Sequence, residues 1–428
     1  MQEKVIQVAL LGLGTVGGGV YRIIKSQTEE MSNKLGAKIE IKKILVRNQE
    51  KAKKRIGNDP AITTDWNEII SDPDISIVIE VMGGIEPAKT YISQALAAGR
   101  HVVTANKDLI AQSSEELTQL AQKHHTDLKF EAAVAGGIPI IGPLQGSLTA
   151  NHITEIMGIV NGTTNFILSS MTEEGMDFST ALAIAQEKGY AEADPTADVD
   201  GLDAGRKVAI MASLAFNSRV TFDDVFTEGI RTVSAKDIRY ADEFGRVIKL
   251  VGIARQDAEG IEVRVHPMLI KKTHPMATVS GSFNAVFLHG DAVDDVMFYG
   301  RGAGDLPTGS AIMGDVFEIT RDIVNGSAGK TRDLCYKHIP IKKMEDCVSR
   351  FYLRMEVEDK PGVLATLTSV LGNNAVSIRQ IVQKEHEEEG AEIVIITDYT
   401  KERHIMDALL TFERMSMVRN KPMVIRVY

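Results

Sequence analysis

A glycine-rich turn directly after an apolar run constrains the fold of this chain more than any other feature. Residues 5–11 form the run, interrupted only by Gln7, and residues 12–17 read Gly-Leu-Gly-Thr-Val-Gly. In such a G-x-G-x-x-G pattern the first glycine permits a tight turn, the second lets the backbone approach a pyrophosphate, and the third lets helix and strand pack closely. The sequence therefore predicts a strand, a dinucleotide-binding turn and a helix, with cofactor contacts at Gly12, Gly14 and Gly17.

Residues 16–104 continue this alternation of helix and strand. Further strands are expected at residues 39–46, 75–81 and 101–104, and helices at 16–26 and 88–98. Strands and helices that alternate at this spacing are typical of a doubly wound parallel sheet. The expected fold class is therefore α/β at the N-terminus.

The residues after the second expected strand bear on which nicotinamide cofactor binds. That strand ends Val-Arg-Asn at residues 46–48, and three lysines follow at 51, 53 and 54. Sites for NAD usually place Asp or Glu here, whereas an arginine suits the 2′-phosphate of NADP. Arg47 therefore favours NADP, although a solvated basic helix start would look the same and NAD is still possible.

Size, charge and cysteine content exclude several classes of protein. A chain of 428 residues suggests roughly three domains. A net charge of −10 argues against nucleic acid or an anionic membrane surface as the main partner. Two cysteines cannot build a disulfide framework, and no apolar run approaches the ~18 residues of a membrane span. We expect a cytoplasmic protein.

Carboxylates concentrate in one segment of the middle third. Residues 192–203 carry five of them, and Arg206 and Lys207 follow. Asp203 and Lys207 are four residues apart, so they share one face of a helix. A solvated loop with a surface ion pair is the plainer interpretation, but the apolar helix beyond Lys207 places this pair at the edge of a core.

A second lysine follows a predicted strand. Lys107 comes directly after the strand at residues 101–104, at the carboxyl edge where open α/β sheets bind their ligands. We expect this lysine to point at cofactor or substrate, with a solvated loop as the alternative.

Four motifs together resemble homoserine dehydrogenase. They are the glycine turn, Thr-Ala-Asn-Lys at 104–107, Asn-Gly-Thr-Thr-Asn at 161–165, and the acidic segment at 189–207. The resemblance covers about residues 1–325. After it, residues 350–428 show a strand–helix–strand–strand–helix–strand pattern, with Asp-Lys-Pro-Gly at 359–362, that looks like an amino-acid-binding ACT domain.

This resemblance implies a fold in several domains. A Rossmann-type doubly wound nucleotide-binding domain is followed by an α+β catalytic and dimerisation domain and a C-terminal ferredoxin-like ACT domain. The expected bounds are 1–135 for the first domain with 305–325 packing back on it, 136–304 for the second, 326–349 for a linker and 350–428 for the ACT domain.

The resemblance also implies an activity and its residues. The family interconverts L-aspartate 4-semialdehyde and L-homoserine with NAD(P)H, on the route to threonine, methionine and isoleucine. Lys207 matches its acid/base and Lys107 a lysine near nicotinamide and substrate. Glu192, Asp203 and Asp198 match the family's carboxylates that bind the substrate. The further cofactor contacts match Thr15, Val16, Thr104, Gly189 and Gly304.

Two further sites and an assembly into a homodimer or homotetramer are carried over from the family. A monovalent cation such as Na⁺ is expected at Glu131, Val134, Gly136 and Ile138. An amino-acid effector such as threonine is expected between paired ACT domains near Gly362 and Asn374, although the tail could serve only to join chains in a homodimer or homotetramer. Deleting residues 350–428 should then leave an active enzyme that no longer responds to threonine.

Two other functions are weighed against this one. One is another NAD(P)-dependent dehydrogenase of amino-acid metabolism, such as a phosphorylating semialdehyde dehydrogenase. That reaction needs a nucleophilic cysteine beside a histidine, and both Cys335 and Cys347 lie in or beside the expected linker. The other is a non-catalytic amino-acid sensor, which would have lost the lysines and carboxylates that this chain keeps.

Overall fold

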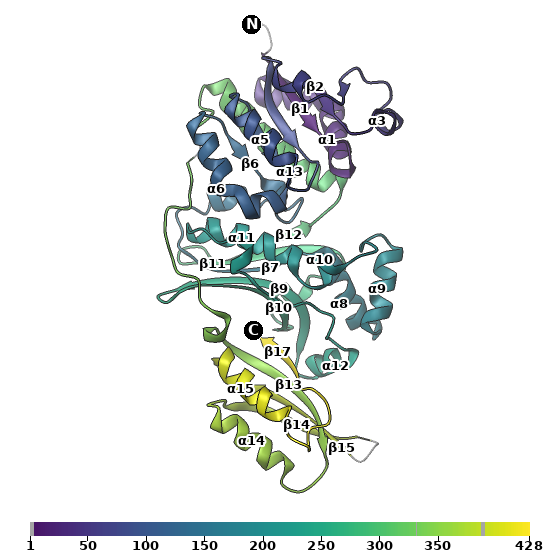
Figure 1. Ribbon diagram of the computed structural model, residues 1–428, viewed down its shortest axis with the longest axis vertical. Coiled ribbons are helices and arrows are strands. Elements are labelled where there is room, and N and C mark those ends of the chain that lie inside the picture. The colour runs from purple at the N-terminus through teal and green to yellow at the C-terminus, as the bar shows by residue number, and fades with distance from the viewer. Residues whose placement is uncertain (1–3, 331, 387–389) are drawn as a thin grey trace. The chain divides into compact units, whose positions relative to one another are not determined.

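The structure is a computed structural model that describes residues 4–330, 332–386 and 390–428 (Figure 1). Two compact units divide the chain. The first comprises Met1–Ile156, Ala209–Asp223 and Phe283–His338, and the second Met157–Val208, Asp224–Ser282 and Ile339–Tyr428. Within the described ranges, no helix is both long and apolar enough to cross a bilayer.

A parallel sheet of six strands forms the centre of the first unit. Its order is β3-β2-β1-β4-β5-β6, and all neighbouring strands are parallel. Strands β2 and β3 are added on one side of β1, and β4, β5 and β6 on the other, so the strand order reverses between β1 and β4. Its strands are β1 (Lys4–Leu11), β2 (Ala37–Leu45), β3 (Ile62–Thr63), β4 (Ile75–Glu80), β5 (His101–Thr104) and β6 (Leu128–Lys129). This order confirms the doubly wound parallel sheet that the alternation of segments predicts.

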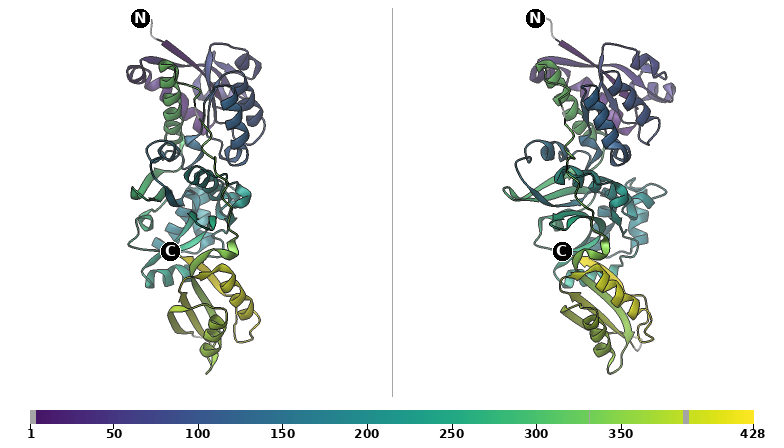
Figure 2. Two further views of the ribbon diagram at one scale, coloured as in Figure 1. Left: turned by 90° about the vertical axis from the view of Figure 1, so that its left-hand side faces the viewer. Right: turned by 60° about the vertical axis from the view of Figure 1, so that its left-hand side comes forward.

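Helices cover both faces of this sheet, which is why its central strands are apolar throughout. They are α1 (Thr15–Ser26), α2 (Thr28–Leu35), α3 (Gln49–Ile56), α4 (Asn67–Ile70), α5 (Ala88–Ala97), α6 (Lys107–Lys123) and α13 (Asp305–Asn325). Figure 2 shows the green helix α13 on one side of the sheet and the blue helices α5 and α6 on the other.

Helix α13 comes from much later in the sequence and packs on α1. Small residues allow this: a side chain at Gly19 would meet the carbonyl oxygen of Asp305 at 2.1 Å. Ile312, Val316 and Ile319 then join the same apolar core as β1. Residues 305–325 therefore contribute one wall of the core that surrounds the parallel sheet.

The remaining elements of the first unit fall between β6 and α13 in the sequence. They are η1 (Glu131–Ala133), α7 (Ile141–Gln145) and the antiparallel pair β11 (Phe283–Gly290) and β12 (Asp294–Arg301). Three elements run across the division between the units: β7 (Ile153–Ile159), α11 (Leu202–Phe216) and η2 (Phe222–Asp224).

The second unit is built on a long antiparallel pair, β9 (Arg246–Asp257) and β10 (Gly260–Lys271). Almost every residue of β10 is buried. The other elements before residue 283 are α8 (Gly162–Glu174), α9 (Phe178–Glu187), α10 (Thr196–Val199), β8 (Phe226–Thr227), α12 (Ala235–Glu243) and η3 (Pro275–Thr278).

The C-terminal part of the second unit has the predicted strand–helix–strand–strand–helix–strand order, with a short additional strand. Its elements are η4 (Met344–Asp346), β13 (Val348–Glu358), α14 (Val363–Asn373), β14 (Ile378–His386), β15 (Gly390–Thr397), β16 (Thr400–Lys401), α15 (Glu402–Phe412) and β17 (Met423–Val427). Strand β17 pairs with β13 and also, in parallel, with β10. The sheet therefore continues from β9 and β10 into this domain.

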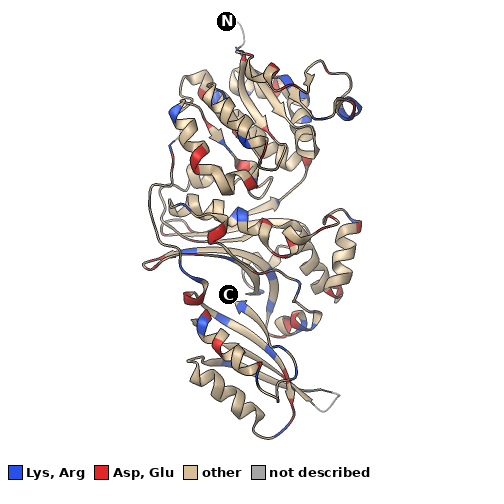
Figure 3. Ribbon diagram, in the orientation of Figure 1, with Lys and Arg blue, Asp and Glu red and all other residues tan. Residues whose placement is uncertain are grey.

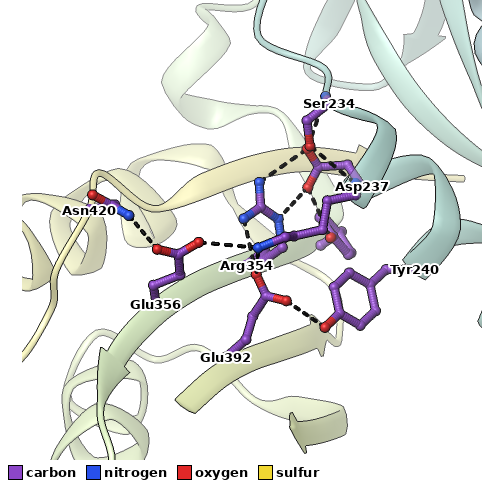
Figure 4. A network of polar contacts seen from close by, with 9 residues as sticks. Ser234, Asp237, Tyr240, Arg354, Glu356, Glu392 and Asn420 are labelled. Atoms are coloured by element: carbon purple, nitrogen blue, oxygen red, sulfur yellow. Dashed lines mark hydrogen bonds and ion pairs between the residues drawn. The ribbon is translucent and has the colours of Figure 1, made fainter. Parts of the chain in front are cut away.

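Buried ion pairs strengthen that continuity (Figure 4). Asp237 of α12 has no exposed surface and accepts hydrogen bonds from Arg354 Nε at 2.6 Å and the Tyr352 hydroxyl at 3.0 Å. Arg354 also donates to Glu392 of β15, which accepts from the hydroxyl of Tyr240. A deletion of residues 350–428 would therefore remove partners of both α12 and β10, not only an appended module.

Candidate active site

The glycine turn adopts the conformation that its sequence predicts. Gly12 has φ of +101°, and a side chain there would meet the carbonyl oxygen of Val81 at 2.9 Å. A side chain at Gly17 would meet the carbonyl oxygen of Gly12 at 2.2 Å. Gly14 is the N-cap of α1, so Thr15 and Val16 form its first turn, where free backbone N–H groups favour an anion.

A cavity of about 600 Å³ lies beside this turn in the first unit. It is lined by the ends of β1, β2 and β4, where the strand order reverses, as expected for a ligand site of an open α/β sheet. Arg47 and Lys51 both line it, and Arg47 is exposed. The structure therefore places two cations where a nucleotide phosphate can reach them.

A buried carboxylate that the sequence did not single out fixes the edge of this cavity. Glu80 ends β4 without exposed surface and accepts hydrogen bonds from the backbone of Met82 at 2.7 Å and Gly83 at 3.2 Å. Thr104, predicted as a cofactor contact, is fully buried and its hydroxyl donates to Glu80 at 2.6 Å. The Thr104 side chain therefore supports the loop that lines the cavity.

Lys107 stands at the start of a helix. Asn106 caps α6 by accepting from the backbone of Leu109 at 3.2 Å, and its amide donates to the carbonyl of Gly84 at 2.6 Å. Lys107, the first residue of α6, is partly exposed directly after β5. Its position at the carboxyl edge of the sheet is the one that the sequence predicts.

Gly304 lies at the start of another helix of the first unit. It is the N-cap of α13 with φ of +125°, a conformation that few other residues adopt. The next residue, Asp305, pairs with Arg22 of α1. Gly304 therefore helps to hold α13 against the helix that follows the glycine turn.

The segment expected to bind a monovalent cation forms a buried turn. Both carboxylate oxygens of Glu131 accept backbone N–H groups of residues 140–142, at 2.6–2.8 Å, and so cap α7. The backbone carbonyls of Val134, Gly136 and Ile138 accept no hydrogen bond in the described part of the chain. Cations with oxygen ligands use such carbonyls. Across the described residues, no cluster of three or more His, Cys, Asp or Glu side chains is arranged to hold a metal.

The predicted helical pair of acid and lysine is present and buried in the second unit. Lys207 Nζ lies 2.7 Å from Asp203 Oδ2 on α11 and donates to the carbonyl oxygen of Val160 at 2.7 Å. The two residues are only 9% and 4% exposed. This geometry excludes the plainer interpretation of a solvated surface pair.

Asn161 joins this pair to a neighbouring carboxylate. Its amide donates to Asp203 at 2.9 Å and to Asp198 at 2.7 Å, while its side-chain oxygen caps α8 by accepting from the backbone of Thr164 at 2.9 Å. The sequence motif at 161–165 contains this residue, and an Asn directly before a helix is a usual N-cap signal. Its hydrogen bonds to the two aspartates could not be read from that signal.

Two further predicted residues of the second unit lie outside the cluster. The side chain of Glu192 is exposed and has no hydrogen bond or ion pair within the described ranges. Gly189 has φ of +74° in the turn after α9. The turn is attached to α8 because the Thr163 hydroxyl donates to the carbonyl of Tyr190 at 2.6 Å.

A second buried lysine was missed by the sequence analysis. Lys249 of β9 is 5% exposed and donates to the carbonyl of Val279 at 2.6 Å and to Asn165 Oδ1 at 3.2 Å. Burial lowers the pKa of Lys249 to about 8, although Glu173 opposes this shift. Its position within the apolar run at residues 247–251 was the available signal.

The two cysteines do not provide a nucleophile. Burial raises the pKa of the Cys335 thiol to about 11 and that of Cys347 to about 12. Since the thiolate is the reactive form, these raised pKa values disfavour a nucleophilic role for either thiol at neutral pH. They therefore argue against a phosphorylating semialdehyde dehydrogenase.

The two expected effector residues lie at opposite ends of one helix. Gly362 is the N-cap of α14 and Asn374 its C-cap, where the Asn374 amide donates to the carbonyl of Val370 at 2.9 Å. A helix of this length separates its ends by about 16 Å. One chain therefore does not bring these residues to a single small ligand.

Family models match most of the chain. The NAD-binding domain of homoserine dehydrogenase matches residues 12–131, the homoserine dehydrogenase model residues 139–317, and the ACT domain residues 351–413. Among curated relatives, a homoserine dehydrogenase of Synechocystis sp. is 46% identical over 431 residues, which cover 99% of both chains. One of Bacillus subtilis is 42% identical over 427 residues, covering 99% of this chain and 98% of the relative.

Solved structures agree with these matches. A homoserine dehydrogenase crystal structure from Thiobacillus denitrificans has a TM-score of 0.94 at 42% identity, covering 99% of this chain and 98% of that one. A hyperthermophilic archaeal homoserine dehydrogenase in complex with NADPH has a TM-score of 0.63 at 26% identity, covering 73% of this chain and 97% of that one.

The depressed pKa of Lys249 gives the folded protein a specific dependence on pH. The unfolded chain keeps this lysine protonated up to about pH 10.4, whereas the folded chain releases the proton near pH 8. Stability therefore rises with pH between these values and is flat below pH 8. We expect the wild type to gain about 3 kcal/mol over this window relative to Lys249→Met.

The measurement is the urea midpoint of both proteins at several pH values from about 7 to about 10.5, a range that includes both pKa values. Lys34→Met, which removes a lysine whose side chain is 62% exposed, serves as the control. Its urea midpoint should change with pH as that of the wild type does. Parallel curves for Lys249→Met as well would contradict the assignment.

Proposed function

The chain belongs to the homoserine dehydrogenase family, and on that premise we propose that Lys207 is the acid/base group for the substrate oxygen. The protein is an NAD(P)-dependent oxidoreductase with the family's activity, the interconversion of L-aspartate 4-semialdehyde and L-homoserine. The observation that carries the assignment of Lys207 is its burial between the Asp203 carboxylate and the Val160 carbonyl.

The geometry of Lys207 suits a proton donor. An ammonium group has three N–H donors, and two of them are directed at Asp203 and Val160. The third donor is available to a substrate oxygen. As the aldehyde is reduced, negative charge builds on that oxygen, and a fixed ammonium stabilises it and supplies the proton. The nicotinamide supplies the hydride.

The substrate's own ammonium group calls for carboxylates. Asp198 is held at the cluster by Asn161, and the exposed Glu192 is a further carboxylate without a partner in the described ranges. We assign both, with Asp203, to substrate binding. Lys107 is assigned to the ligand side of the first unit's sheet, next to the nucleotide.

The cofactor is a nicotinamide dinucleotide, and we assign a preference for NADP. Arg47 and Lys51 line the cavity beside the glycine turn, and no carboxylate ends β2. A guanidinium group matches phosphate oxygens well. The archaeal relative solved with NADPH is in keeping with this preference.

Several finer points belong to the same proposal. The buried carbonyls of Val134, Gly136 and Ile138 suit a monovalent cation such as Na⁺, with Glu131 shaping their turn. We assign residues 1–135 with 305–325 to cofactor binding, 136–304 to catalysis and dimerisation, 326–349 to a linker and 350–428 to regulation by an amino acid such as threonine. The two free thiols suit the cytoplasm.

An assembly of two or four chains is part of this proposal. Leu364, Met406 and Leu410 are apolar side chains of α14 and α15 that are 37–52% exposed. A second chain against them would also be needed if Gly362 and Asn374 are to serve one effector, because they lie at opposite ends of α14.

Replacing Lys207 tests the assigned acid/base. Lys207→Ala should lower kcat for L-homoserine oxidation by about 10²–10⁴-fold, because the oxygen loses its proton partner. The Kd for NADP should stay within about twofold, since the cofactor contacts are elsewhere. The measurement is the steady-state absorbance of the reduced nicotinamide, with cofactor affinity measured separately.

The control is Lys34→Ala, which breaks a pair with the same four-residue spacing that is exposed. It should leave kcat unchanged. A nearly normal kcat in Lys207→Ala would shift the role to Lys107 or to water.

The cofactor preference depends on Arg47. Arg47→Asp should lower kcat/KM for NADP by about 10- to 100-fold, because the 2′-phosphate loses a charged hydrogen bond and meets a carboxylate. The value for NAD should hold or rise. Lys54→Asp makes the same change of charge sign on an exposed residue of α3 outside the cavity and should affect both cofactors little. An equal loss with both cofactors in Arg47→Asp would contradict the assignment.

A further inference from the structure

A second cavity, in the second unit, is lined by cations. It has a volume of about 460 Å³ and lies among β9, β10, the start of β13 and the end of β17. Arg255, Arg264, Lys271 and Arg350 line it, and no Asp or Glu does. Figure 3 shows this concentration as blue bands on the strands around the end marked C. We refer to it below as the basic cavity.

The most buried of these cations is incompletely satisfied. Arg264 is 1% exposed; it donates to the Ser349 hydroxyl at 2.9 Å and to Glu262 at 3.2 Å, but its Nε has no hydrogen-bond partner. Arg255 approaches the same oxygen of Glu262 at 3.5 Å. One carboxylate is thus shared by two guanidinium groups.

The other cations are at most partly compensated. Lys271 is exposed, and no hydrogen bond or ion pair of its side chain occurs within the described ranges. Arg350 contacts Asp398 at 3.4 Å and lies over the ring of Tyr399 at 4.1 Å. Arg246 lies next to Arg350, and the pKa of Arg246 is lowered by burial and by the charge of Arg350.

We propose that the basic cavity is a binding site for a small anionic metabolite that carries a phosphate or carboxylate group. A buried arginine, an unpaired lysine and two further arginines around one cavity provide the charge and the donors that such a group needs. The rings of Tyr399, Tyr428 and His274 supply apolar surface for the rest of a ligand. No macromolecule is required, since the cavity has the size of a small-molecule site.

The basic cavity lies at a different position from the effector site expected in the ACT domain. The basic cavity uses Val348–Arg350 at the start of β13, whereas Gly362 follows the end of that strand. It also takes Lys271 from the end of β10 and His274 from the turn that follows. A ligand here would contact β10 and β13 together and so stabilise the junction between the catalytic part and the ACT domain.

The test uses the full chain saturated with NADPH, so that the nucleotide site does not take up the added anion. Inorganic phosphate and succinate are titrated separately by calorimetry, with sodium chloride at equal ionic strength as the reference. We expect at least one of them to bind with a Kd of about 1 mM or tighter. Which of the two binds identifies the phosphate or the carboxylate as the recognised group.

Neighbouring lysines provide a matched pair of variants. Lys271→Gln removes an exposed cation of the basic cavity and should weaken binding by about five- to tenfold. Lys272→Gln changes the next residue, which pairs with Asp242 away from the cavity, and should leave the Kd within about twofold. Arg350→Met should weaken binding as Lys271→Gln does. No heat with either anion up to about 10 mM, or equal weakening by Lys271→Gln and Lys272→Gln, overturns the proposal.

Discussion

The ion pair between Lys207 and Asp203 is the interaction on which the proposed chemistry depends. Both groups are almost completely buried, and taking two charges out of water is costly unless their remaining hydrogen bonds are made. The carbonyl of Val160 makes one of them to Lys207 and the amide of Asn161 makes one to Asp203. Removing one partner of such a pair costs about 3–5 kcal/mol, so the residues around it serve stability and chemistry at once.

The same principle operates at the edge of the cofactor cavity and at the ACT junction. Glu80 is buried because it satisfies two backbone N–H groups and Thr104, and this fixes the loop after β4. Asp237 is buried because Arg354 and Tyr352 satisfy it, and this fixes α12 against β13. In each place, a buried carboxylate joins separate segments of the chain through hydrogen bonds.

Much of the fold followed from the sequence, because apolar runs and glycine signals are local. Strands β1, β2, β4 and β5 of the parallel sheet, the helix that begins near Asp203 and the order of the last domain were predicted. Strands β3 and β6 were not, since two residues make no apolar run. The pairing of β17 with β10 joins residues far apart in sequence, and no local pattern indicates it.

The candidate site was predictable to a similar extent. The four-residue spacing placed Asp203 and Lys207 on one face, but it could not show that Val160 and Asn161 complete their hydrogen bonds. The exposure of Glu192 also depends on how the chain folds between motifs, whereas the separation of Gly362 from Asn374 follows from the length of the helix between them. Lys249 was missed because a single lysine in an apolar strand carries no motif.

The most direct test of this account is kcat for L-homoserine oxidation in Asn161→Ala. This change keeps Lys207 and removes the amide that holds Asp203 and Asp198. It also removes the N-cap of α8, so kcat is compared only in protein shown to be folded. The account predicts a fall in kcat of about 10- to 100-fold, with NADP affinity unchanged, because a small misplacement of the proton donor is sufficient. An unchanged kcat in folded protein would contradict it, since Lys207 would then work without the amide that holds Asp203 and Asp198.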